Sequence, residues 1–317
     1  MKVLDRIRRS RSRALRWTIV TSAPRGVAGE QWGDTWFACD LADALIRAGH
    51  DATVVSRAGA AAASTTEDDV VIVLRGLKEV VPPADRRSIW MMWIISHPEL
   101  VTEDEVRSFD AVFVASPLWR PPGDGASTVL LQATAPRRFH PGAGDPDCGA
   151  RVLFVGSTRG EFRLAVRAAL RSKQADRLGL YGVGWQDFLA EGQITGEFLP
   201  NAALPAAYAS AGVVLNDHHK DMAEAGFLSN RLFDAVASGS RVFSDRVAGV
   251  QELFGSSVVV FHSEDELVRL LDEPLDEVFP DRQERLRNAA RIAEEHSFDK
   301  RAAVLIQRAE EIRGRAS

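Results

Sequence analysis

The stretch from residue 216 to residue 245 carries the side chains best suited to hold a diphosphate. Ser229 is a suitable N-cap for a helix, and Asn230 and Arg231 follow it directly. A helix start offers free backbone N–H groups and about half a unit of positive charge from the helix dipole, to which Arg231 adds a fixed charge. Asp234 follows one turn later, where its carboxylate could accept hydrogen bonds from both hydroxyls of a ribose. The stretch therefore predicts a nucleoside-diphosphate site, although an ordinary capped helix with a surface Asp fits the same residues.

Two arginines and a histidine lie where parallel strands are expected to end. Arg159 and Arg163 are four residues apart and follow a strand and Gly156, where they could neutralise phosphate charge. His97 follows an apolar strand and could contact a sugar or its leaving oxygen. Solvated arginines and a histidine satisfied within the core are the simpler interpretations of the same residues.

We expect no metal site and no bound cofactor. His218 and His219 are adjacent, so at a strand end they point to opposite sides and rarely share one ion. Asp145 and Asp147 form a D-x-D pair, but Pro146 and the neighbouring glycines favour a turn at that place.

The elements that must position these residues alternate between strand-like and helix-like segments. Segments with helical spacing, such as the one in which Phe37, Leu41 and Leu45 share a face, separate the apolar runs. Near-continuous apolar runs are what a parallel sheet covered on both faces requires. They occur at 17–22, 52–56, 70–74, 89–95, 111–115 and 128–132, and again at 151–156, 178–181, 213–216, 241–244 and 258–261. This alternation predicts the α/β class with doubly wound parallel sheets.

A segment rich in Pro and Gly, 135–150, divides the chain into two such domains because it has no periodicity. We therefore expect a basic N-terminal extension at 1–16, a first domain at 17–140, a linker at 141–150, a second domain at 151–285 and C-terminal helices at 286–317. Two α/β domains imply a cleft between the carboxyl ends of their strands, which is the usual ligand position.

Length and composition are ordinary for a soluble globular enzyme, since 45% of the 317 residues are hydrophobic and 26% are charged. The longest apolar run is too short to span a membrane, and the chain start lacks the apolar core of a signal peptide, so we expect a cytoplasmic protein. Lys2 and six arginines against Asp5 give residues 1–16 a net charge of +6, which leaves −11 for the rest of a chain whose formal charge is −5. The acidic body argues against nucleic-acid binding. The basic start could contact the inner face of the membrane weakly, or be a solvated terminus.

The run EAGFLSNRLFDAVASGSRVFSD, residues 224–245, resembles the nucleotide-binding signature of GT-B glycosyltransferases, particularly the CgeB-like and family 4-like groups. In that signature an acidic residue and a Gly-Phe turn precede a second acidic residue, which heads Ala-x-Ala-x-Gly and a strand. The matching residues are Glu224, Gly226, Phe227, Asp234, Ala235, Ala237 and Gly239. The sequence departs from the signature at two places: Asp234 stands where many relatives have Glu, and Glu224 stands two residues before the position of the first acid.

Other segments between residues 17 and 262 resemble the same family in the same order. The glycine-rich loop with Gly33 and Asp34 resembles the loop that faces the acceptor or the donor phosphate, and the segment with His97 resembles the position that reaches the donor sugar. The catalytic residues that this resemblance implies are His97, Asp34, Arg159 and Arg163. The donor-binding residues that it implies are Gly33, Gly156, Ser157, Tyr181, Gly182, Phe198, Leu199, Glu224, Gly226, Phe227, Ser229, Asn230, Arg231 and Asp234.

The resemblance implies a GT-B fold, in which two Rossmann-like doubly wound domains face each other across a cleft and the final helices pack back towards the first domain. It also implies a metal-independent glycosyltransferase that moves a sugar from a nucleoside-diphosphate sugar, its co-substrate, to a glycan, lipid or natural-product acceptor. Retention of configuration, which we expect, needs no dedicated base because the departing phosphate can take the acceptor proton. Inversion would require a base, and Asp34 is the candidate. An epimerase or phosphorylase of the same fold, or a non-catalytic sugar-nucleotide-binding subunit, are the alternatives.

Overall fold

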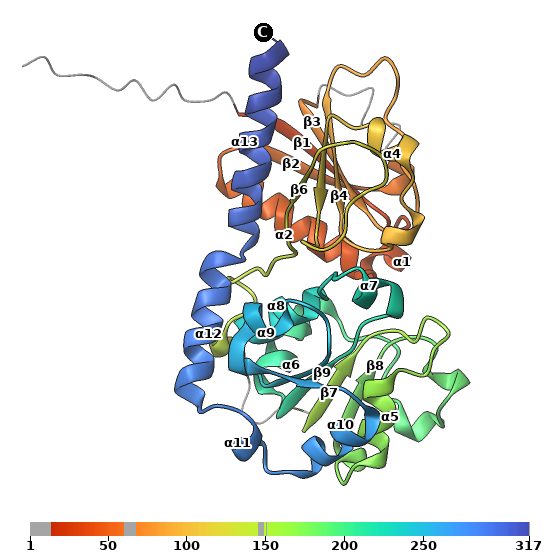
Figure 1. Ribbon diagram of the computed structural model, residues 1–317, viewed down its shortest axis with the longest axis vertical. Coiled ribbons are helices and arrows are strands. Elements are labelled where there is room, and N and C mark those ends of the chain that lie inside the picture. Colours follow the sequence, from red (N-terminus) through yellow and green to blue (C-terminus); the bar gives the residue numbers. More distant parts are fainter. Residues whose placement is uncertain (1–13, 60–67, 145–148, 150, 317) are drawn as a thin grey trace, which may run out of the picture.

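The computed structural model describes residues 14–59, 68–144, 149 and 151–316. Figure 1 shows two α/β units, one above the other, and two long C-terminal helices that run along one side of both. Most of the basic extension, residues 1–13, and the Asp145 and Asp147 pair lie outside the described residues. In the described ranges, no helix combines the length and the apolar character needed to cross a membrane.

The first unit is built on a six-stranded parallel sheet. Every residue of β3 and β4 is buried, as expected of apolar runs at the centre of a sheet that is covered on both faces. In sheet order the strands are β2 (Asp51–Ser56), β1 (Arg16–Thr21), β3 (Val70–Arg75), β4 (Ile89–Ile94), β5 (Ala111–Val114) and β6 (Ser127–Val129). The α-helices are α1 (Val27–Glu30), α2 (Gly33–Arg47) and α4 (Glu103–Arg107). β6 ends at Val129, short of the predicted 132. Beyond it, the Gln132 side chain donates to Ile95 O and the Thr134 N–H donates to His296 O.

The second unit is built on a five-stranded parallel sheet. In sheet order its strands are β8 (Leu178–Tyr181), β7 (Val152–Val155), β9 (Val213–Asn216), β10 (Val242–Asp245) and β11 (Val258–Phe261). Its α-helices are α5 (Leu164–Arg171), α6 (Leu204–Ser210), α7 (Lys220–Glu224), α8 (Asn230–Ala237), α9 (Val250–Phe254), α10 (Glu264–Asp272) and α11 (Leu275–Val278). Both units are therefore doubly wound α/β sheets, as the apolar runs predict.

Each sheet reverses its strand order at one place. In the first unit the reversal lies between β1 and β3, and in the second it lies between β7 and β9. In open α/β sheets, ligands bind outside the carboxyl ends of the strands at such a reversal. The loops that follow these four strands are thus the parts of the fold that can form a site.

The last two helices belong to different units. Helix α12 (Arg282–Glu295) packs against α8 of the second unit, whereas α13 (Phe298–Ala316) packs against α2 of the first. The Phe298 ring lies edge-on against Phe37 with ring centroids 4.7 Å apart, and Arg47 pairs with Asp299 at 2.8 Å. The C-terminal segment therefore returns to the first unit only from Phe298 onwards, and residues 286–295 stay with the second unit.

We predict that Phe298→Ala lowers the free energy of unfolding by about 3–5 kcal/mol, because it leaves a cavity where a fully buried ring meets Phe37. Denaturant titration followed by circular dichroism measures the change. Val304→Ala is the control, since Val304 lies on the same helix and is 38% exposed. Equal losses in the two variants would show that the Phe298 contact does not hold α13 in place.

Candidate active site between the two units

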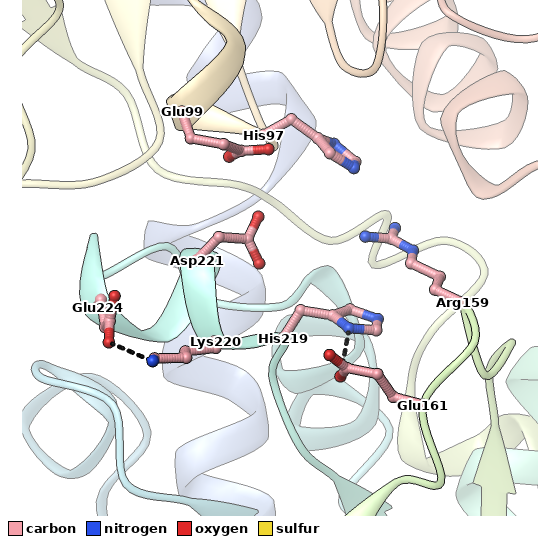
Figure 2. Close-up of a pocket in the computed structure, with 8 residues that line it drawn as sticks. All are labelled: His97, Glu99, Arg159, Glu161, His219, Lys220, Asp221 and Glu224. Carbon is pink, nitrogen blue, oxygen red and sulfur yellow. Dashed lines mark ion pairs between the residues drawn. The ribbon is translucent and has the colours of Figure 1, made fainter.

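A pocket of about 520 Å³ lies between the two units, and every side chain that lines it is ionisable. The first unit contributes the loop after β4, and the second contributes the loops after β7 and β9 together with α7 (Figure 2). The lining residues are His97, Glu99, Arg159, Glu161, His219, Lys220, Asp221 and Glu224. In the second unit the pocket lies at the reversal between β7 and β9, as the strand order predicts. In the first unit it is lined from the loop after β4, the strand next to β3, and not from the reversal itself.

His97 and Arg159 enter this pocket from opposite units, and both have a strained backbone. Each has a φ of 51°, and within the described part of the chain they are the two non-glycine residues with positive φ. Burial lowers the pKa of His97, and the positive charge of Arg159 lowers it further. The imidazole is therefore held in its neutral form at neutral pH, facing a guanidinium.

Three acidic residues face the pocket from the side opposite Arg159. Figure 2 shows Glu99 of the first unit pointing towards Asp221 of α7 across the space between the units. Burial raises the pKa of Glu99, and the neighbouring Asp221 carboxylate raises it further. Glu224 lies on the same short helix and pairs with Lys220 at 3.8 Å. One side of the pocket is thus acidic and the other carries a guanidinium.

Asp34 lies in the first turn of α2, at the reversal between β1 and β3. A Cβ at Gly76 would come within 2.6 Å of Ser22 Oγ and 3.2 Å of Asp34 Oδ2. The absence of a side chain at Gly76 therefore leaves room for the Ser22 and Asp34 side chains to pack against its backbone. Burial raises the pKa of Asp34, and the charge of Arg159 opposes part of that rise. Gly33 begins α2, and an added side chain there would meet no other atom.

Arg163 is buried behind the pocket and does not line it. Its guanidinium pairs with the Asp217 carboxylate, donates to Asp217 O at 2.6 Å and contacts His219 Nε2 at 2.8 Å. A weaker bond of 3.4 Å reaches Ser157 O. The charge of Arg163 is thus neutralised by Asp217 inside the second unit. Its bonds to His219 and Ser157 O hold His219 and the loop that carries Arg159 in place.

Arg231 reaches the reversal between β7 and β9 from the first turn of α8. It donates to Val155 O at 2.6 Å and to Asn216 Oδ1 at 3.0 Å, and it lies 4.9 Å from the centre of the Phe154 ring. Its Nε is buried without a hydrogen-bond partner among the described residues. Arg231 lies directly beside Gly156, since a Cβ there would come within 2.8 Å of its Nη2.

The start of α8 is held by a histidine. Ser229 is the N-cap residue, but its side chain makes no cap hydrogen bond. Its backbone N–H instead donates to His218 Nε2 at 2.9 Å, so that nitrogen carries no proton. The His218 proton is then on Nδ1, which lies 2.6 Å from Asp245 Oδ1. The histidine that sequence reasoning considered as a metal ligand therefore holds a helix N-terminus.

Asp234 is buried, so the interpretation of a surface Asp does not apply. Thr134 Oγ1 donates to its Oδ1 at 2.8 Å, and Asn230 Nδ2 donates to its Oδ2 at 2.8 Å. Burial raises the pKa of Asp234 well above its ordinary value, and the bond from Thr134 opposes that rise. The carboxyl therefore lies at the first turns of α8 but is already bonded on both oxygens.

The Gly-Phe turn that the resemblance assigns to the donor forms a contact between the units. Gly226 has a φ of 68°, and a Cβ there would come within 2.9 Å of Leu118 Cδ1. Phe227 is fully buried, and its ring packs edge-on against Trp119 at 5.9 Å instead of lining the pocket.

Four of the predicted donor-binding residues, Tyr181, Gly182, Phe198 and Leu199, lie at the end of β8 or beside it. Tyr181 forms an isolated parallel bridge with Gly196, which brings the segment 196–199 beside the end of β8. In that segment Phe198 is 40% exposed. Leu199 is half-buried next to it. Gly182 has a φ of 144°, and a Cβ there would lie 2.1 Å from Gly156 O, so the loops after β7 and β8 pack closely.

Sequence reasoning missed five residues that line the pocket: Glu99, Glu161, His219, Lys220 and Asp221. It considered His219 only as a metal ligand. The helical spacing of residues 220–224 is the one signal that could have placed Lys220 and Glu224 on one face. Nothing local indicates that Glu99 faces Asp221, because they lie in different units. Among the described residues, no group of three or more His, Cys, Asp or Glu side chains is arranged to hold a metal ion.

We predict that Asp234→Asn raises the melting temperature at neutral pH by about 1–3 °C, the size expected for roughly 1 kcal/mol in a chain of this length. Because the pKa of Asp234 is raised in the folded protein, the neutral carboxyl stabilises the fold at acid pH, and this contribution is lost as the pH rises through the folded-state pKa. Asn removes the buried charge, so its advantage should shrink towards pH 4.

Thermal unfolding between pH 4 and pH 8 measures this difference. Asp104→Asn is the control, since the Asp104 side chain is 97% exposed. A lower melting temperature of Asp234→Asn at neutral pH would mean that the bonds from Thr134 and Asn230 outweigh the cost of burying the charge.

Comparison with known proteins agrees with this architecture. Residues 159–307 match a protein family described as glycosyl transferase-like. Among curated proteins, none matches the chain in sequence. The finer likeness to CgeB-like and family 4-like groups stays a prediction.

Solved structures of glycosyltransferases match almost the whole chain. AviGT4, a glycosyltransferase involved in Avilamycin A biosynthesis, has a TM-score of 0.63 and 18% identity over 93% of this chain and 97% of its own. HepE from Anabaena, in complex with UDP-glucose, has a TM-score of 0.60 and 12% identity over 92% and 99%. BGT from phage T4, in complex with UDP and Mn²⁺, has a TM-score of 0.58 and 12% identity over 95% and 99%. The chain thus has the GT-B fold of glycosyltransferases. The match to the glycosyl transferase-like family covers most of the second unit, α12 and the first half of α13.

Proposed function

We propose that this chain is a glycosyltransferase that moves a sugar from a nucleoside-diphosphate sugar to an acceptor hydroxyl. The observation that carries the proposal is that His97 and Arg159 line one pocket from opposite units, each with a φ of 51°. Such strained conformations cost about 1–3 kcal/mol each and cluster at active sites. The complexes of HepE with UDP-glucose and of BGT with UDP support this class of donor.

The two sides of the pocket suit the two halves of a sugar nucleotide. Arg159 follows β7, where a diphosphate would also meet the backbone of Gly156 and Ser157. On the other side, Glu99 and Asp221 suit sugar hydroxyls, because a carboxylate oxygen accepts hydrogen bonds readily. We therefore assign the diphosphate to the Arg159 side and the sugar to the acidic side.

Transfer breaks the bond between the anomeric carbon and the diphosphate oxygen, and a bond from the acceptor oxygen to that carbon replaces it. Negative charge grows on the departing diphosphate, so Arg159 stabilises the transition state more than the ground state. In the retaining course that we propose, the departing phosphate takes the acceptor proton. His97 is neutral at neutral pH and would hydrogen-bond to the sugar instead of adding charge.

The acceptor would approach from the first unit. Asp34 and Ser22 lie together at the reversal between β1 and β3, within reach of the charge of Arg159. A glycan, a lipid or a natural product could each supply the hydroxyl. If the reaction inverts configuration, Asp34 is the group placed to take the acceptor proton, and its raised pKa would make it a stronger base than an ordinary Asp.

We predict that UDP, or one of GDP, dTDP and ADP, stabilises the protein thermally, and that Arg159→Leu weakens this binding about tenfold or more. Loss of a hydrogen bond between charged groups costs about 1.5–3 kcal/mol, and 1.4 kcal/mol corresponds to a factor of ten. Isothermal titration calorimetry measures the affinity. Arg171→Leu is the control, since it removes an arginine of the same unit whose ion pairs are on the surface. Failure of all four nucleotides to bind the wild-type chain would refute the proposed function.

We further predict that transfer from the selected sugar nucleotide continues in the presence of EDTA and retains the anomeric configuration. An array of glycan, lipid and natural-product acceptors would supply the acceptor, and NMR of the first-formed product measures the configuration. An inverted product that disappears with Asp34→Asn would replace retention by base catalysis. Isomerisation of the donor without any acceptor would indicate an epimerase, and loss of turnover in EDTA would show that a metal is needed.

A further inference from the structure

The chain passes between its two units twice, and the two passages are bonded to each other. Thr134, in the segment after β6, forms an isolated parallel bridge with Ser297, between α12 and α13. The Thr134 N–H donates to His296 O at 2.9 Å, and the Phe298 N–H donates to Thr134 O at 3.0 Å. Arg301 adds bonds of 2.7 Å to Leu131 O and 2.9 Å to Gln132 O.

The side chain of Thr134 links this bridge to α8. Thr134 is fully buried, and its hydroxyl donates to Asp234 Oδ1 at 2.8 Å. Asp234 in turn accepts a bond from Asn230, whose own Oδ1 is buried without a hydrogen-bond partner among the described residues. Thr134, Asp234 and Asn230 therefore form a continuous row from the interdomain bridge to the first turn of α8.

We propose that Thr134 is a positioning residue of the nucleotide site, because its hydroxyl orients the Asp234 carboxylate for the donor. Through this bond, nucleotide binding at α8 is coupled to the bridge between Thr134 and Ser297. The inference rests on the proposed function and on the sequence prediction that Asp234 of α8 binds the ribose of the donor. A carboxylate offers about four lone-pair sites, so Asp234 can keep the bond from Thr134 and still accept one from a ribose hydroxyl.

The side chain is separable from the bridge itself. Both bonds of the bridge come from the Thr134 backbone, so a change of side chain leaves them in place. Val has almost the shape of Thr but lacks the hydroxyl, and Ser keeps the hydroxyl. A purely structural role would lower stability without changing nucleotide affinity, whereas a positioning role changes the affinity through Asp234.

We expect Thr134→Val to weaken UDP binding about tenfold, with kcat at saturating donor changed less than the donor KM, and Thr134→Ser to stay within about twofold of the wild type. Tenfold corresponds to about 1.4 kcal/mol. Thr18→Val is the matched control, because Thr18 is a buried threonine of the first unit whose hydroxyl donates to Asp68 Oδ2 at 2.7 Å. It should lower stability and leave UDP affinity unchanged.

A double-mutant cycle tests whether Thr134 acts through Asp234. In an Asp234→Asn background, Thr134→Val should weaken UDP binding by less than twofold. An undiminished effect in that background would overturn the proposal, as would wild-type affinity of Thr134→Val itself. If none of the four nucleotides binds the wild-type chain, the proposed function is refuted. If UDP binds the wild type and all Thr134 variants equally, the proposed function stands and only the inference about Thr134 is refuted.

Hydrogen exchange provides a second test that needs no Thr134 variant. Saturating UDP should slow amide exchange in peptides that cover residues 130–139 and 296–301 of the wild-type protein. The same peptides should respond less in Asp234→Asn at saturating UDP. Unchanged exchange in the wild type would mean that the nucleotide site and the bridge are not coupled.

Discussion

The arrangement of the two domains depends on the way α13 leaves the second domain and packs against the first. Helix α12 ends against α8, and Phe298 then buries its ring beside Phe37 of α2. The exposed pair between Arg47 and Asp299 contributes little beside that burial. Because the chain is anchored at both of its passages between the domains, the carboxyl ends of both sheets face the same space. A pocket lined by both domains follows from this constraint.

Each side of the pocket is backed by a buried ion pair. In the first domain Arg75 pairs with Glu105 at 2.6 Å and donates to Leu100 O at 2.9 Å, which fixes the loop that carries His97. In the second domain Arg163 pairs with Asp217 behind the loop that carries Arg159. Buried ion pairs add little net stability, since desolvation offsets their attraction. Their effect here is geometric, because each one bonds the carbonyl groups of a loop that carries a pocket residue.

The strain at His97 and Arg159 is consistent with this support. A left-handed backbone at a non-glycine residue persists only where the surroundings determine it, and both residues lie in loops that buried arginines hold. Held in this way, neutral His97 and charged Arg159 need little rearrangement when charge develops on a leaving group. Preorganised charges of this kind are the largest source of rate acceleration in many enzymes.

The sequence by itself determined the α/β class and the positions of most strands of the two sheets, because the periodicity of apolar residues is a local property. It also singled out His97, Arg159 and Glu224, which line the pocket. His97 and Arg159 follow the strands β4 and β7, and Glu224 ends α7, so their places could be predicted from neighbouring residues.

Only the tertiary structure decided which of these polar side chains are free and which are already bonded. Arg163 has the same local setting as Arg159, yet Asp217, which follows a different strand, pairs with it. Asp234 resembles a surface Asp in sequence, but Thr134 bonds to it from the interdomain passage 100 residues away. Glu99 and Asp221 likewise face each other from different domains (Figure 2). Such contacts depend on which strand ends adjoin and on where α13 holds the domains, and no local pattern of residues encodes either.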